Sequence, residues 1–225
     1  RLARERDEAN IRKVSKWENF WYHNKWTVGI VGAILIIALI SVFQFLEKEN
    51  PDAVVMYAGP NYIGETAAGE LKPYLSSLVK DVNGDGQGLV TLYAVVYVPG
   101  GSGSSMAMKQ FTNEFAVGES CLFFLSPEMY EVAKDTGCLL PLNEIFGNSL
   151  PEGAVDEYGI RLGSTSFFLD NETVGQLGEN VIVCVKDCTK MVTTLLGKKE
   201  SETQKETAGD MLRSLVNYQS PPSTK

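Results

Sequence analysis

The chain has 225 residues, with 20 Lys or Arg against 28 Asp or Glu and a net charge of −8 at pH 7. This length allows one domain, or one domain with an anchor. The acidic balance argues against a nucleic-acid partner, because a negatively charged surface repels phosphate groups.

An uncharged stretch lies near the N-terminus. Residues 26–45 read WTVGIVGAILIIALISVFQF. As a helix rising ~1.5 Å per residue, this stretch crosses a hydrocarbon core of ~30 Å. A cleaved signal peptide is the alternative, but its apolar region usually has ~7–15 residues and ends at a small-residue cleavage site. The stretch here is longer and runs into QFLEKENPD. The sequence therefore predicts one transmembrane helix at 26–45, which makes the membrane a partner.

Charge on either side of this stretch predicts its orientation. Residues 1–25 hold seven Lys or Arg and four Asp or Glu, a net charge of +3, which leaves −11 for the rest of the chain. By the positive-inside rule, residues 1–25 form a cytoplasmic juxtamembrane segment rich in basic and aromatic residues. We expect a linker at 46–52, an extracytoplasmic domain at 53–219 and a disordered tail at 220–225. This is a single-pass cell-membrane protein, as in a bacterial envelope.

The expected outer domain lacks the side chains of common hydrolases. His23 is the only histidine and precedes the apolar stretch. Ser-His-Asp and Cys-His catalysis both need an imidazole base. No pair of carboxylates can be assigned to one pocket, as glycosidase chemistry requires. We therefore expect no enzyme and assign no catalytic residue.

The cysteines do not form a metal or redox motif. Their spacing contains no C-x-x-C pair, which argues against zinc and thioredoxin-like chemistry. An even number outside the membrane is compatible with disulfides in three pairings, and buried structural thiols are the other interpretation. The residues concerned are Cys121, Cys138, Cys184 and Cys188.

From residue 53 onward, strand and helix patterns alternate. Strand patterns cover 53–60, 89–98, 121–126 and 180–187, and helix patterns cover 64–82, 106–120, 127–137 and 201–218. Residues 157–171 are compatible with one or two further strands. This order predicts an α/β fold, with a three-layer domain in which helices cover both faces of a mainly parallel sheet.

One segment resembles a known family. Residues 110–146, QFTNEFAVGESCLFFLSPEMYEVAKDTGCLLPLNEIF, resemble part of the extracytoplasmic solute-binding proteins of the type 2 periplasmic-binding fold. With the preceding order of elements, the resemblance covers about 53–146. This chain has Ser120-Cys121 where that family often has Pro-Asp. The domain is also too short for two full lobes, so the resemblance implies about one lobe.

Ligands of such folds bind beyond the carboxyl ends of parallel strands. The corresponding segments here are 57–62, 99–105 and 126–128, which suit a neutral or anionic solute held by hydrogen bonds and aromatic stacking. Ordinary loops without a ligand are the alternative. The candidate ligand-binding residues are Tyr57, Asn61, Tyr62, Ser102, Ser104, Ser105 and Ser126.

A turn resembles the start of a calcium-binding loop. DVNGDGQGLVTL, residues 81–92, offers Asp81, Asn83, Asp85 and Gln87 as ligands of Ca²⁺. Position 12 of the loop is Leu92 instead of the bidentate Glu. The alternative is a plain Asn/Asp-Gly turn. We expect no other cofactor.

Together these features predict a membrane-anchored, extracytoplasmic binding or sensing module of solute-binding type, working in transport beside a membrane transporter. The alternative is a structural protein that uses a degenerate scaffold to dock a membrane or envelope partner.

Overall fold

The computed structural model describes residues 16–46, 51–190 and 197–219. It contains two units, residues 1–49 and residues 50–225, which we treat separately. The expected tail at 220–225, and most of the expected segments 1–25 and 46–52, lie outside the described residues.

The N-terminal unit contains helix α2, Lys16–Leu46. Its stretch Phe20–Val42 is long and apolar enough to cross a membrane. Large apolar side chains such as Ile37 and Leu39 are exposed. A helix that is apolar on all sides needs an apolar environment. Helix α2 includes the whole predicted span at 26–45 and is a candidate membrane anchor or signal sequence.

The second unit is built on one five-stranded sheet in the order β2-β1-β3-β5-β4. Its strands are β1 (Ala53–Gly59), β2 (Val90–Val96), β3 (Leu122–Leu125), β4 (Gly159–Arg161) and β5 (Ile182–Val185). Strand β1 pairs in parallel with β2 and β3, whereas β5 pairs antiparallel with β3 and β4. The sheet is therefore mixed, and the expectation of a mainly parallel sheet is not confirmed.

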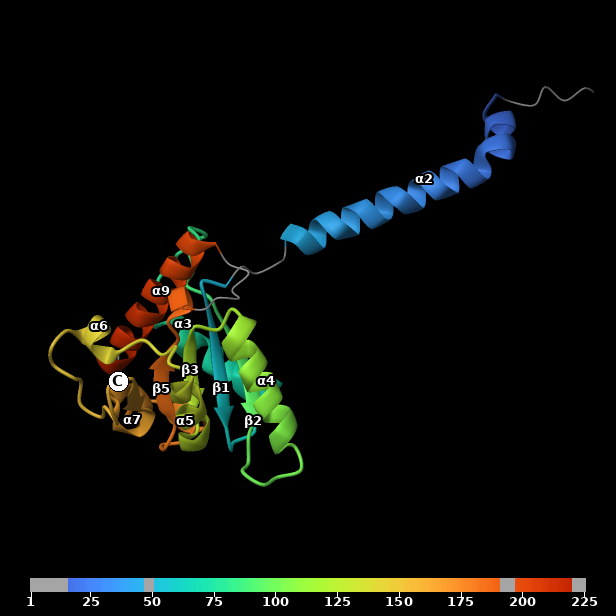
Figure 1. Cartoon of the computed structure of the whole chain (residues 1–225). Coiled ribbons are helices and arrows are strands. Elements are labelled where there is room, and N and C mark those ends of the chain that lie inside the picture. The colour runs from blue at the N-terminus through green and yellow to red at the C-terminus, as the bar shows by residue number, and fades with distance from the viewer. Residues whose placement is uncertain (1–15, 47–50, 191–196, 220–225) are drawn as a thin grey trace, which may run out of the picture. The chain divides into compact units, whose positions relative to one another are not determined.

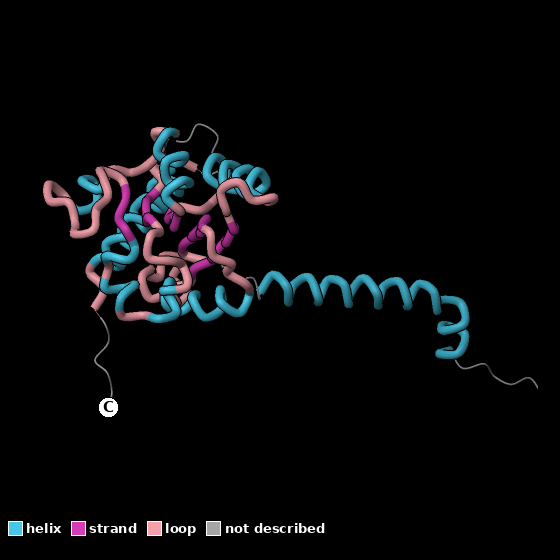
Figure 2. The backbone as a smooth tube through the Cα atoms, turned by 90° about the horizontal axis from the view of Figure 1, so that it is seen from below, coloured by secondary structure: helices cyan, strands magenta, loops and turns pink. Residues whose placement is uncertain are grey.

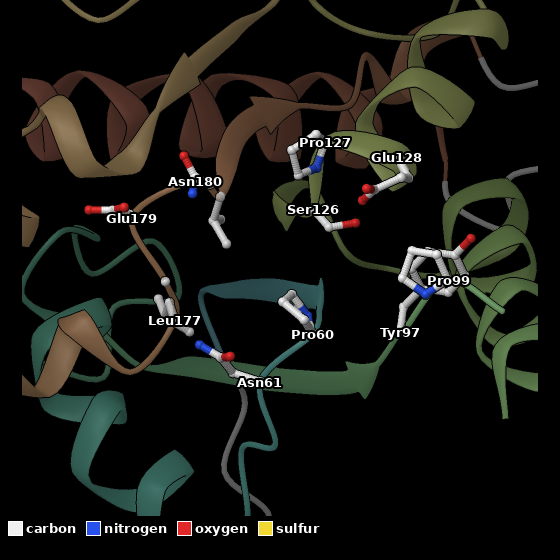
Figure 3. A pocket seen from close by; sticks show the side chains of 12 residues that line it. Pro60, Asn61, Tyr97, Pro99, Ser126, Pro127, Glu128, Leu177, Glu179 and Asn180 are labelled. Carbon is white, nitrogen blue, oxygen red and sulfur yellow. The ribbon is translucent and has the colours of Figure 1, made fainter. Parts of the chain in front are cut away.

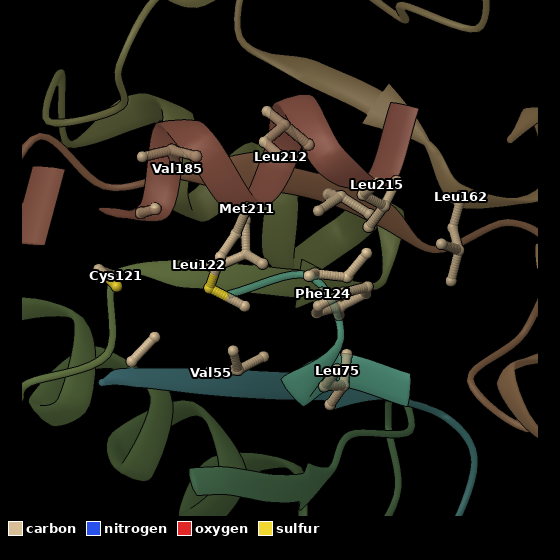
Figure 4. Packing of buried hydrophobic residues seen from close by; sticks show 14 of the residues in the cluster. Val55, Leu75, Cys121, Leu122, Phe124, Leu162, Val185, Met211, Leu212 and Leu215 are labelled. Carbon is tan, nitrogen blue, oxygen red and sulfur yellow. The ribbon is translucent and has the colours of Figure 1, made fainter. Parts of the chain in front are cut away.

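Helices cover both faces of the sheet (Figure 1). Side chains alternate between the faces along a strand. In β1, Val55 belongs to one core and Met56 to the other. The first core also includes residues of α3 (Glu65–Ser76) and α9 (Lys198–Val216), and the second includes residues of α4 (Ser104–Val117) and α5 (Pro127–Asp135). Figure 4 shows the first core, where Leu212 and Leu215 of α9 lie above Leu122 and Phe124 of β3.

The chain between β3 and β5 is mostly short helices and loops. Figure 2 shows loops and turns, in pink, around the strands of the sheet. After α5 the short helices are α6 (Leu142–Phe146), α7 (Ser166–Leu169) and α8 (Glu172–Gly175). Of the one or two strands expected within 157–171, only β4 forms. The next residues turn into α7 because the Thr165 hydroxyl accepts the backbone N–H of Phe168 at its start, which allows Phe167 to enter the core.

Candidate functional site

The sheet has a topological switch point between β1 and β3. From β1 the chain passes through α3 to β2 on one side, and from β2 it returns through α4 to β3 on the other side. Helices α3 and α4 pack on opposite faces of the sheet. Their divergence leaves a crevice at the carboxyl ends of β1 and β3, where ligands bind in open α/β sheets.

A cavity of about 480 Å³ lies at this crevice. Figure 3 shows Pro60, Ser126 and Leu177 around the same space. A cavity of ~300–1,000 Å³ suits a small molecule. The lining residues are Pro60, Asn61, Tyr97, Pro99, Ser126, Pro127, Glu128, Leu177, Gly178, Glu179, Asn180 and Val181.

Each of the three expected segments contributes to this cavity. Pro60 and Asn61 follow β1, Pro99 follows β2, and Ser126 follows β3. Two of the seven candidate residues, Asn61 and Ser126, line the cavity.

The other candidate residues lie elsewhere. Tyr57 is 0% exposed, so its ring is inaccessible to a ligand, which corrects the expected stacking role. Its side chain lies on the same face of β1 as that of Val55 and belongs to the first core. Tyr62 is 81% exposed and is not part of the lining. Ser102, Ser104 and Ser105 lie before and at the start of α4, also outside the lining.

Ser126 begins helix α5 as its N-cap. Its hydroxyl accepts the backbone N–H of Met129 at 3.4 Å, and Pro127 follows at the first helical position. This confirms the predicted start of the helix. This bond uses one acceptor position of the serine oxygen, and Glu128 places a carboxylate in the first turn.

Asn61 connects two walls of the cavity. Its side-chain Nδ2 donates to the backbone oxygen of Gln176 at 2.8 Å, and its backbone N–H donates to the Tyr57 hydroxyl at 3.0 Å. Burial raises the pKa of Tyr57, although the bond from Asn61 opposes the rise. The hydroxyl therefore stays a neutral acceptor that holds the turn after β1.

The wall at residues 177–181 was not predicted. Because β5 is antiparallel to β3, the residues that precede β5 lie at the edge where β1 and β3 end. Gly178 has a φ of +100°, which allows the tight turn into this strand. The glycine before NVIVCVKD was the local signal of a turn, but it did not give the direction of the strand.

The lining contains acidic side chains but no basic ones. Its charged residues are Glu128 and Glu179. Arg161 donates to the side-chain oxygen of Asn180 at 2.9 Å but is not part of the lining. An anion would face these carboxylates, so of the neutral or anionic solute that was expected the cavity fits the neutral one, and it also suits a positively charged ligand.

The calcium-loop candidate forms a turn held by its own side chains. Asp81 accepts the backbone N–H of Gly86 at 2.8 Å, and Asp85 accepts that of Gln87 at 2.9 Å. Asn83 accepts the N–H of Asp85 at 2.8 Å. Within the part of the chain that the structure describes, no group of three or more His, Cys, Asp or Glu is placed to hold a metal ion.

Asp52, assigned to the linker by the sequence, also holds this turn. Its carboxylate accepts backbone N–H groups of Val82 and Asn83, at 2.7 and 2.9 Å, and of Leu89 at 2.8 Å. Burial opposes its ionisation, but these hydrogen bonds prevail and lower its pKa. Asp52 therefore joins the start of β1 to the turn before β2.

The four cysteines are free thiols. Cys121, Cys184 and Cys188 are buried, and Cys138 is half-buried. Burial raises the pKa of Cys121 to about 12, which keeps this thiol protonated and unreactive. Cys121 and Cys138 therefore lie on either side of β3 and α5 as structural residues.

No protein-family model matches the chain, and no curated protein or solved structure matches it either. The resemblance of residues 53–146 to solute-binding proteins therefore stays a prediction from the sequence.

Proposed function

We propose that this chain is a non-enzymatic, membrane-anchored binding module that holds a small neutral or cationic solute at the carboxyl ends of β1 and β3. Helix α2 anchors it, and the domain lies on the extracytoplasmic side, as in a reduced one-lobe solute-binding protein beside a transporter. The observation that carries this proposal is the cavity at the switch point, lined from β1, β2, β3 and the wall before β5.

The chemistry of the lining supports this class of ligand. Pro60, Pro99, Leu177 and the ring of Tyr97 offer apolar surface, and Glu128 offers a carboxylate. Such a surface suits an apolar body with a hydrogen-bonding or ammonium group, as in amino acids or short peptides.

A second candidate function is docking without a ligand. It is favoured because the polar groups of Ser126 and Asn61 already bond within the protein, to Met129 and Gln176. Each of these side chains therefore offers a ligand fewer hydrogen-bonding groups than a free one would.

Thermal melting of the full chain in detergent distinguishes the two functions. Neutral sugars, amino acids, oligopeptides, polyamines and Ca²⁺ are added in turn. A ligand at ~100 times its Kd stabilises the folded state by about 2.7 kcal/mol, which raises the midpoint by roughly 5–10 °C for a domain of this size.

Two substitutions assign such a shift to the cavity. Asn180→Trp puts a large ring into the lining and should abolish the shift, whereas Ser105→Trp, at an exposed position outside the lining, should keep it. Glu128→Gln should weaken a cationic ligand more than a neutral one. If no solute shifts the midpoint of the folded protein, the docking function is favoured.

A further inference from the structure

Strand β2 forms an open edge of the sheet. Among the described residues it pairs with β1 alone, and Figure 1 shows it beyond β1 at the end of the sheet. The backbone N–H of Tyr97 donates to Gly59 of β1 at 2.7 Å. Successive residues of a strand direct their backbone N–H and C=O groups to opposite sides. The backbone groups of the even-numbered residues of β2 therefore point away from β1, towards the open edge.

The outward backbone groups of β2 are covered only at its start. The N–H of Val90 donates to the hydroxyl of Ser76 in α3 at 3.2 Å. Farther along, Leu92, Ala94 and Val96 present N–H and C=O groups at the edge, and no described residue is hydrogen-bonded to their N–H groups. Such a row of groups is a template for another strand.

This edge lacks the features that normally prevent pairing. Edge strands of monomeric proteins usually carry Lys, Pro or a bulge. Residues 86–108 contain no charged residue, and β2 contains no proline. Tyr93 is 51% exposed and Val96 is 39% exposed, so apolar side chains on both faces of the strand lie in solvent.

The distribution of charge favours a second copy of the chain as the partner of this edge. The chain after residue 45 carries a net charge of −11, so two copies repel each other over most of their surfaces. The uncharged strand β2 is where two copies can approach without this repulsion. Because residues 86–108 contain no charge, β2 offers a charged partner no complementary charge and matches an uncharged strand instead, and β2 of a second copy is such a strand.

The geometry of β2 also allows it to pair with itself. A two-fold axis through Ala94 makes two β2 strands antiparallel, and places Ala94 opposite its own copy and Leu92 opposite Val96 of the second copy. These outward residues then exchange backbone N–H···O bonds. On the other face, Tyr93 lies opposite Val95 of the second copy, an aromatic and β-branched pair of the kind that stabilises sheets.

We propose that two copies of this chain join their β2 edges antiparallel, which makes one continuous ten-stranded sheet from two sheets of five strands. The proposal does not depend on the solute-binding function, because Tyr93, Ala94 and Val96 lie outside the cavity lining.

The test is the mass of the full chain in detergent micelles, measured by light scattering with the detergent subtracted. The wild type should be a dimer at a protein concentration of about 100 μM. Ala94→Pro should be a monomer, or its dimer should have a dissociation constant at least about tenfold higher. Proline removes an outward N–H without disturbing the pairing with β1, as edge strands tolerate. Ala94→Thr keeps that N–H and should stay dimeric.

A second variant guards against misfolding of the proline variant. Val96→Lys adds a charge at an exposed position, and it should also dissociate the dimer while circular dichroism stays unchanged. A monomeric wild type overturns the proposal. A dimer that persists in both Ala94→Pro and Val96→Lys also overturns it, because the contact then lies elsewhere, for example in α2.

Discussion

The hydroxyl oxygen of Tyr57 accepts a hydrogen bond of 3.0 Å from the backbone N–H of Asn61. A buried ring in β1 thereby fixes the turn that forms one wall of the cavity. Tyr57→Phe removes this acceptor and leaves the N–H without a partner, so we expect a loss of about 1–2 kcal/mol in the free energy of unfolding. Denaturant unfolding measures this loss. Tyr62→Phe, at an exposed ring, is the matched control, and an equal loss in both variants would contradict the assignment.

Lys186 is 2% exposed and forms no ion pair among the described residues. Its amine donates to the backbone oxygen of Gly118 at 2.9 Å and lies over the rings of Phe115 and Phe123. Burial lowers its pKa. Lys186→Met removes a poorly solvated charge and should raise the free energy of unfolding by roughly 1 kcal/mol at pH 7.

The lowered pKa of Lys186 also predicts how the stabilising effect of Lys186→Met changes with pH. Since the folded pKa of Lys186 is lowered, the unfolded wild type binds more protons between that value and its usual value of about 10.4, and wild-type stability rises with pH in this window. The advantage of the Met variant should therefore shrink towards pH 10 in denaturant titrations. Lys186→Ala leaves a cavity and should instead lose about 2 kcal/mol. A constant advantage of Met at all pH values would refute the argument.

For Cys121 we expect the opposite trend, in which the stability of the wild type falls as the pH rises. Burial raises its pKa from 9.0 to about 12, so between these values the folded state keeps a proton that the unfolded state has lost. The stability linked to the protonated Cys121 thiol is therefore fully present below pH 9. Above pH 9 the free energy of unfolding decreases by about 1.4 kcal/mol per pH unit. Cys121→Ala should unfold with a flatter alkaline slope than the wild type. Cys138→Ala controls for the loss of a thiol as such, and identical slopes in wild type and Cys121→Ala would exclude the effect.

Asp156 links α5 to the loop before β4. Its carboxylate accepts hydrogen bonds from the Tyr130 hydroxyl, from Lys134 at 2.7 Å and from the backbone of Tyr158 at 2.8 Å. Burial opposes its ionisation, but the bonds from Lys134 and Tyr130 outweigh it, so the pKa is lowered from 3.8. The stabilisation is present above pH 3.8 and is lost as the pH falls through the lower folded value.

Asp156→Asn should therefore cost about 1–2 kcal/mol at neutral pH and reduce the loss of stability on acidification below pH ~4. Acid titration followed by circular dichroism measures both effects. Glu157→Gln, at the exposed neighbour, should change neither. Unchanged acid sensitivity of the Asn variant would show that Asp156 is not the group responsible.

The elements from β1 to α5 were predictable because their signals are local. CLFFL is apolar throughout, as is typical of a strand buried on both faces, and Ser126, Pro127 and Glu128 mark the start of the following helix. Two cavity residues, Asn61 and Ser126, followed from the rule that ligands bind at the ends of parallel strands.

The rest depends on contacts between distant residues. NVIVCVKD has the pattern of a strand, but alternation with a period of two is the same in either direction, so the sequence does not show that β5 is antiparallel. The wall at 177–181 was missed for this reason. Tyr57 was misplaced because an all-apolar strand does not show which of its rings lie in the core, and Tyr57 lies in the core with residues of α3 and α9.

If the cavity holds a solute as proposed, the bond between Asn61 and Gln176 would bear on how quickly that solute enters and leaves. In a two-lobe receptor the lobes close around the solute, and slow reopening makes release slow. Here the cavity walls are segments that follow or precede strands of one sheet, and a hydrogen bond already joins two of them. A solute would keep one side in contact with water and would exchange rapidly, so such a module would follow changes in solute concentration instead of storing solute.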